Sequence, residues 1–578
     1  MMKYLPNIRL PFNKSESEST HDSRLDNFEM QLPRLGTKPK AFDLGSKKLQ
    51  THLSSYAMEK SQQVREALKY LEQLNKIEVK VPNRLELTNN IIIATGQSLS
   101  DIYRIHSTRG TSIPEKTERR TDLTSTIALI QNLIISYKII VVQDYNLPTK
   151  KFSQQVDRVN FVLLKIFELT LWLQRVLAIR FQKLSSQNWK DINSVFFIYA
   201  NHFDIYEVKQ LTEQLSLYKA SGIFSEKSSR RSIGSIYLSI QIFGLLDISS
   251  WPSNALQSVE QYLEKYEELM TLSLDDNDSL PEDTIVTYLN HYGAPLFEEG
   301  SKGTLQCRIS ISRLKNRLQK DLALLEKRQF IGDEEKKRLK PQGKIDDLED
   351  NAGLLQLFLK NLSKGERSEE RKALYGSKIV YIYNGLAASY RLLYEQMESK
   401  SKVDEHEGHF HNAAARHSSL LVDSESDVLE CQWRIINESD GGALIRTVET
   451  KYMHRMEVGQ LVAVSSDDEM PQLGFITRLD RLRENEIDVA IVKVSSFAES
   501  VTILEPGQEI NGHDLLPGIL IKNLANEWQL ILPRYVEFVA GTPIIVKRNN
   551  DHTPVRLGKA VLTKNGFIMF EARSPGLN

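Results

Sequence analysis

The chain has 578 residues, and 74 basic against 75 acidic side chains give a net charge of −1. Such a balance argues against binding to nucleic acid or to an anionic membrane, both of which select strongly basic surfaces. A chain of this length can bury several hydrophobic cores, so we expect about three or four domains. Two cysteines are too few for a disulfide framework, which favours a reduced compartment and a cytoplasmic location.

The first half of the chain predicts an α-helical module. Residues 1–53 are rich in Ser, Asp, Lys and Pro without sustained periodicity, so we expect a loose arm there. Residues 54–273 repeat apolar side chains at helical spacing. Helices are expected near 56–74, 82–105, 121–142, 152–184, 187–219, 231–246 and 253–272. Helices joined by short polar connections are typical of an antiparallel bundle or a solenoid-like stack, and no fixed-period repeat is evident.

The most hydrophobic stretch, residues 159–179, predicts a buried core helix rather than a membrane span. It contains Lys165, Glu168 and Arg175, and charges at those depths are costly in lipid. The first twelve residues lack the continuous apolar core of a secretory signal. We therefore expect no membrane span.

Residues 274–349 are expected to form a mixed segment followed by a charged linker. The acidic run Asp275–Asp283 resembles a calcium loop, but it lacks the EF-hand spacing, its glycine and its terminal glutamate, so it predicts a solvated linker. A strand is expected at 305–311 and a charged helix near 312–328, ahead of a Lys/Glu/Asp-rich linker at 331–349.

Residues 430–446 predict a strand, a tight turn and a second strand. Apolar and polar side chains alternate before the turn, as in a half-buried strand. Asn437 and Ser439 can hydrogen-bond the local backbone, and Gly441 and Gly442 tolerate unusual backbone angles. Such a turn presents side-chain oxygens and backbone N–H groups that suit guanine or phosphate recognition. Taken alone, an Asn/Ser/Gly cluster is most often a structural turn.

A pair of arginines precedes this hairpin by about seventy residues. Arg367 and Arg371 form an Arg-x-x-x-Arg arm ahead of residues 377–383, a β-branched and aromatic run that predicts a buried strand. The same spacing recurs at Arg313 and Arg317, where it falls in an expected helix and predicts a solvated face. The pattern Asn-x-Ser-x-x-Gly, allowing Asp first, occurs once.

Together the two motifs resemble the PilZ domain, a small β-barrel that binds the bacterial second messenger cyclic di-GMP. In that family the arginine arm wraps phosphates and guanines, and the turn holds a guanine and its phosphate. The resemblance implies a ligand site at Arg367, Arg371, Asn437, Ser439 and Gly442. Residues 458–464, 473–478 and 487–494 resemble the later PilZ strands.

One departure from the PilZ pattern is the length between the arm and the turn. Residues 384–427 separate them, and the part from Gly385 to Gln396 predicts a helix. We interpret this as an insertion in a loop of a barrel spanning 350–505, because long surface insertions cost little closure entropy. Short strands with turn signals predict a further small β-unit at 506–578, either a separate barrel or an extension of the first.

No enzymatic constellation is evident. The chain lacks a P-loop, a nucleophile elbow, a His-Glu-x-x-His sequence and a dinucleotide fingerprint. The Gly-Gly-(Asp/Glu)-Glu-Phe stretch of diguanylate cyclases is absent, and the phosphodiesterase tripeptide occurs only as Glu66–Leu68 inside an amphipathic helix. The histidines from His406 to His417 do not fix a tetrahedral set, so we expect no metal site and no cofactor.

These observations predict an α+β multidomain protein, with an α-helical N-terminal module, a PilZ-like β-barrel and a further β-unit. Its expected function is that of a cyclic-di-GMP receptor. Ligand would order the arm against the turn, and the helical module would pass the signal to protein partners. The alternative is a scaffold protein whose degenerate barrel has lost its ligand. A nucleic-acid-binding protein is a third class, which the charge balance disfavours.

Overall fold

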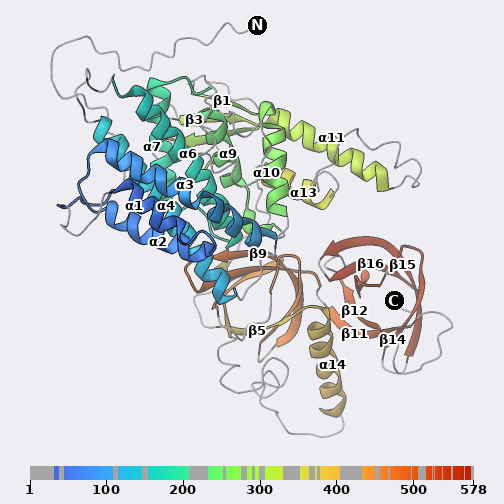
Figure 1. Ribbon diagram of the computed structural model, residues 1–578. Helices are drawn as coiled ribbons and strands as arrows, with labels where there is room; N and C mark the ends of the chain where they lie inside the picture. Colours follow the sequence, from blue (N-terminus) through green and yellow to red (C-terminus); the bar gives the residue numbers. More distant parts are fainter. Residues whose placement is uncertain are drawn as a thin grey trace. The chain divides into compact units, whose positions relative to one another are not determined.

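The computed structural model divides the chain into two compact units, each with its own core (Figure 1). The helical unit comprises Met1–Arg109, Thr117–Ile248 and Asn254–Gly365, and the barrel unit comprises Gly110–Lys116, Ser249–Ser253 and Glu366–Asn578. The structure describes residues 32–37, 45–108, 115–145, 147, 151, 154–206, 232–251, 255–274, 283–289, 293–297, 306–329, 352–363, 372–373, 378–403, 432–439, 441–449, 456–466, 469–495, 497–504, 516–523, 525, 527–536, 538–548, 551–564 and 566–574.

The helical unit follows the order that its apolar periodicity predicts. Its helices are α1 (Ser46–Ser54), α2 (Lys60–Leu74), α3 (Val81–Thr108), α4 (Thr117–Tyr145), α6 (Val156–Ile179), α7 (Ser186–His202), α9 (Ile233–Leu245), α10 (Ala255–Lys265), α11 (Ser312–Gln329) and α13 (Ala352–Asn361), with short 3₁₀ turns η3 (Ile248–Ser250) and η4 (Glu267–Leu269). The helical unit also contains a three-stranded sheet, whose strands pair in the order β1 (Thr271–Ser273), β3 (Gln306–Ser310), β2 (Thr284–Tyr288).

The start of α1 lies inside the stretch where the sequence predicts a loose arm. Leu49 and Leu53 of this helix are buried, so the chain is already anchored before residue 54. The Glu66–Leu68 tripeptide lies in α2, and Glu66 pairs with Lys69 one turn away at 2.7 Å. These contacts give the tripeptide a helical, structural setting.

Helix α6 forms the centre of the helical unit. Every residue from Val159 to Ile179 except Phe161 is buried, as the sequence predicts for a core helix. Lys165 and Glu168 form an ion pair with both side chains buried, because a charge can be kept inside a protein only with a partner. Aromatic side chains pack around the helix, with Phe167 edge-on to Phe196 of α7.

One helix of the described residues, Thr117–Asp144, is long and apolar enough to cross a membrane by length and composition. Two thirds of its apolar window (67%) is buried inside the protein. Core helices pass the same test. The packing of α4 against α6 is consistent with such a core position.

The first barrel of the barrel unit is a sheet closed on itself. Its strands are β4 (Lys372–Ala373), β5 (Ile379–Asn384), β6 (Trp433–Ser439), β7 (Gly442–Val448), β8 (Leu461–Ser466), β9 (Glu469–Arg481) and β10 (Glu486–Lys493). They pair in the order β4-β6-β5-β8-β9-β10-β7, and a further β6–β7 pairing closes the ring. Strand β4 therefore lies outside the ring, as an added strand beside β6.

The second barrel is also closed and antiparallel. Its order is β11 (Phe497–Leu504), β12 (Leu516–Lys522), β13 (Trp528–Pro533), β16 (Phe567–Arg573), β15 (Asp551–Lys564) and β14 (Pro543–Arg548), with β14 returning to β11. Of the two forms expected for the last β-unit, the structure therefore has the separate barrel. Strand β11 belongs to it, although the sequence places residues 497–504 at the end of the first barrel.

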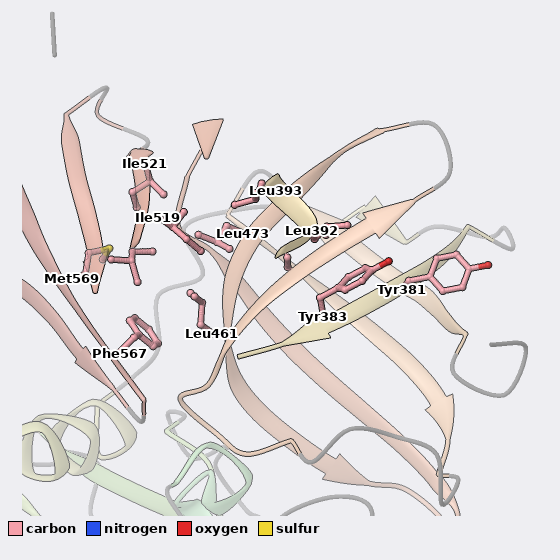
Figure 2. Close-up of a cluster of buried hydrophobic side chains, with 12 residues drawn as sticks. Tyr381, Tyr383, Leu392, Leu393, Leu461, Leu473, Ile519, Ile521, Phe567 and Met569 are labelled. Atoms are coloured by element: carbon pink, nitrogen blue, oxygen red, sulfur yellow. The ribbon is translucent and has the colours of Figure 1, made fainter. Parts of the chain in front are cut away.

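Helix α14 (Leu386–Val403) joins the two barrels within the barrel unit. Its Leu392 and Leu393 pack among Tyr381 and Tyr383 of the first barrel and Ile519 of the second (Figure 2). The sequence predicts this helix correctly but interprets it as part of a surface-loop insertion. The buried side chains correct that interpretation, because they make α14 a shared core element of both barrels. Residues 404–427 lie outside the described residues.

Candidate functional site

The Asn-x-Ser-x-x-Gly motif forms the end of β6, a tight turn and the start of β7, as the sequence predicts. Ser439 lies opposite Gly442 in the strand register, and its Oγ donates a hydrogen bond to the Gly442 carbonyl at 3.4 Å. The backbone N–H of Lys493 on β10 donates to the Gly441 carbonyl at 2.9 Å. The turn is therefore fixed to two neighbouring strands.

A β-bulge decides which way Asn437 points. Ile435 pairs with Ile445, but the next pair is Asn437 with Leu444, so Ile436 is the extra residue. Ile435 and Ile445 are buried in the barrel. Because side chains alternate along a strand, the bulge moves Asn437 and Ser439 together onto the outer face. The two polar residues of the motif therefore share one surface of the barrel.

Glycine at position 442 is required by close packing of β7 on β10. A side-chain carbon there would collide with the Ile491 carbonyl oxygen. Beside the turn, Lys493 Nζ donates to Glu438 Oε1 at 2.8 Å, and both side chains are largely buried. The sequence predicts Gly442 as a turn residue, and the structure adds that its missing side chain allows the strands to approach.

The chain that follows the arginine arm lies directly beside the turn. Lys372 and Ala373, which come after Arg371, form β4 and pair with Glu438 and Asn437 of β6. The long segment between arm and turn therefore leaves β4, the strand that follows the arm, paired with the strand that leads into the turn. Arg367 and Arg371 themselves lie outside the described residues, so their side chains are not placed.

The outer face beside the turn also carries arginines that the sequence did not single out. Arg434 of β6 is directly opposite Arg446 of β7, on the same face as Asn437. Arg446 binds Asp488 of β10 through two hydrogen bonds of 2.6 and 2.9 Å. These bonds raise the pKa of Arg446, although partial burial works in the opposite direction. Only strand register brings these residues together, so sequence spacing gave no signal for them.

The other Arg-x-x-x-Arg copy has the setting that the sequence predicts. Arg313 and Arg317 lie exposed on α11. Arg317 pairs with Asp321 at 3.0 Å and its guanidinium lies over the ring of Tyr266 at 5.2 Å. This copy is a solvated helix face.

Metal chemistry finds no support in the part of the chain that the structure describes. No group of three or more His, Cys, Asp or Glu side chains there could hold a metal ion. The His406–His417 cluster and the acidic run from Asp275 to Glu282 lie outside the described residues. Burial raises the pKa of the Cys307 thiol, which disfavours the reactive thiolate.

Comparison with known proteins concerns the N-terminal half. Residues 50–278 match a family model described as "Cyclic-di-GMP receptor FimW, N-terminal domain". The match covers less than half of the chain and ends before the strands of the two barrels begin. The matched family is, by its description, one of cyclic-di-GMP receptors. No curated protein and no solved structure matches the chain.

Proposed function

We propose that the chain is a cyclic-di-GMP receptor whose ligand site is the outer face of the first barrel beside Asn437 and Ser439. The observation that carries the proposal is the pairing of β4 with β6, because it brings the chain next to Arg371 alongside the turn. The closed ring with an added strand supports a PilZ-like barrel. The similarity of residues 50–278 to a cyclic-di-GMP receptor points independently to the same ligand.

The residue types fit the ligand's chemistry. Cyclic di-GMP carries two phosphate charges and two guanines, and the planar fork of an arginine matches both phosphate oxygens and the O6/N7 edge of guanine. A hydrogen bond to a charged group contributes about 1.5–3 kcal/mol. Micromolar affinity corresponds to about 8 kcal/mol. Arg367 and Arg371 would therefore supply a large share of the affinity, and Asn437 and Ser439 would orient a guanine.

The proposed mechanism links the ligand site to the helical unit through the chain itself. Ligand would hold the arm at 367–371 against the turn. The linker 331–366, nearly all of which belongs to the helical unit, leads directly into that arm, so fixing the arm would change the restraints on the helical unit. The helical unit would then present a surface to protein partners. Such a switch requires different ligand affinities in the two states.

Calorimetric titration of cyclic di-GMP into the full chain tests the proposal. We expect saturable binding near the micromolar range, weakened about tenfold or more by Arg371→Ala, Arg367→Ala or Asn437→Ala. Arg313→Ala is the matched control, since it removes an exposed arginine from the other Arg-x-x-x-Arg copy, on α11. This control should bind like the wild type.

Two results would contradict the proposal. Folded wild-type protein that gives no binding would favour the alternative of a scaffold with a degenerate barrel. Equal loss of affinity in Arg313→Ala and Arg371→Ala would place the ligand elsewhere. Binding of oligonucleotides at low salt, without binding of cyclic di-GMP, would favour the nucleic-acid class instead.

A further inference from the structure

A row of charged side chains crosses the outer face of the first barrel, one strand to the next. The register places Arg434 of β6 opposite Arg446 of β7, Arg446 opposite Asp488 of β10, and Asp488 opposite Asp480 of β9. The row is therefore positive at its β6 end and negative at its β9 end.

The two arginines at the positive end differ in their partners. Arg446 is held by Asp488 and lies 3.6 Å from Glu486. Arg434 is exposed, and no carboxylate among the described residues lies within ion-pairing distance of it. Like charges directly opposite on neighbouring strands destabilise a sheet. Among the described residues, Arg434 therefore faces a like charge and has no carboxylate partner.

Arg434 lies close to the turn motif. Arg434 precedes Asn437 by three positions, one of them the bulged Ile436, which corresponds to roughly 7–10 Å along the strand. Both side chains face outward, and β4 adjoins β6 next to Asn437. The flank that continues from β6 through β5 and β8 to the first part of β9 is covered by α14. The β6 side is thus the flank on which a ligand meets these groups.

We propose that Arg434 is a third arginine of the ligand site and binds a phosphate of the cyclic dinucleotide. This inference rests on the proposed function. Arg446 is less suited to the role because Asp488 already binds its Nε and Nη2, and Glu486 lies 3.6 Å from its Nη1. The same holds for Arg478 of β9, which pairs with Asp480 at 2.7 Å. Asp488 and Asp480 are already paired with Arg446 and Arg478, so the excess positive charge of the row lies at its β6 end, beside Arg434.

Titrating cyclic di-GMP into Arg434→Gln and Arg483→Gln tests this role. Arg483 is the matched control, since it is 84% exposed, pairs only at 3.5 Å with Glu486, and lies after the end of β9. We expect Arg434→Gln to weaken binding about tenfold or more and to make it less sensitive to salt. Arg434→Lys should recover part of the affinity, because it keeps the charge but not the fork.

The outcomes separate this inference from the proposed function. If wild type and Arg434→Gln bind equally while Arg371→Ala is weakened, the role of Arg434 is refuted and the receptor proposal stands. If the wild type does not bind cyclic di-GMP, the receptor proposal and the role of Arg434 both fail. Hydrogen exchange of peptides from β6 and β7 gives a further check, because removing a like-charge pair should leave the barrel at least as stable. Faster exchange of these strands in Arg434→Gln would assign Arg434 a structural role and overturn the inference.

Discussion

Replacing Gly442 by alanine should loosen the turn and the strand pair behind it. The added methyl group would collide with the Ile491 carbonyl oxygen, a backbone atom that cannot rotate away. Ordinary contact lies at 3.4–4 Å, so β7 and β10 would have to separate by about 1 Å. Forced overpacking of this kind costs about 1–3 kcal/mol. We expect a loss of that size, confined to the first barrel.

Local stability is the quantity to measure, because a chain of several domains does not unfold in one two-state step. Hydrogen exchange of peptides from β7 and β10 reports it directly. A loss of 1–3 kcal/mol corresponds to exchange about 5- to 150-fold faster in these strands. Peptides of the helical unit should exchange as in the wild type.

Two other glycines provide the controls. At Gly474 an added carbon would lie 2.6 Å from the Val492 carbonyl oxygen, so Gly474→Ala should destabilise the same barrel without altering the turn. At Gly36 the nearest atom would be an ordinary 3.7 Å away, so Gly36→Ala should change little. Gly442→Ala should weaken cyclic-di-GMP binding more than Gly474→Ala does. Unchanged exchange in Gly442→Ala would refute the close-packing argument.

Three further predictions concern other parts of the molecule. Arg481 is buried and pairs with Glu449 at 2.5 Å and with Glu115 at 3.8 Å. Arg481→Leu should lower the free energy of unfolding of the barrel unit by about 3–5 kcal/mol, as measured by hydrogen exchange of β9, because it removes the partner of a buried charge. Leu393→Ala on α14 should lower the free energy of unfolding by about 2–5 kcal/mol and speed hydrogen exchange in both barrels. Faster exchange in one barrel alone would contradict a shared core. Burial raises the pKa of Asp101, but hydrogen bonds from Lys60 and Gln97 outweigh it and lower the pKa. Its contribution to the helical unit is therefore complete above about pH 4 and lost as pH falls further. Below about pH 4, the protection of α3 peptides from hydrogen exchange should therefore change less with pH in Asp101→Asn than in the wild type.

Local patterns predict most of the elements but not how they pair. The run from Val380 to Tyr383 predicts a buried strand, and the structure explains its continuous apolarity. One face of β5 lines the barrel and the other packs against α14. Strand β11 escapes prediction because Glu499 and Ser500 interrupt its apolar pattern. Glu499 is buried only because Arg548 of β14 binds it at 2.6 Å, a partner that is distant in sequence.

The candidate site, too, can be predicted from the sequence only in part. The motif residues Asn437, Ser439 and Gly442 can be found in the sequence because their spacing is fixed by a single turn. The bulge at Ile436 cannot be found in the sequence, since it exists only in the pairing of β6 with β7. The opposition of Arg434 and Arg446 depends on the same register. A sequence pattern therefore locates the turn, while the charge distribution around it is a property of the closed barrel.

The long segment between the arm and the turn illustrates why sequence distance is a poor guide here. A loop insertion would leave both barrels able to form without it. Helix α14 instead buries Leu392 and Leu393 between them, so its removal would expose apolar surface on each. Meanwhile β4 and β5 both pair with β6, one at each end of that strand. The chain can therefore leave β5, contribute α14 to the shared core and enter β6 with both β4 and β5 beside that strand.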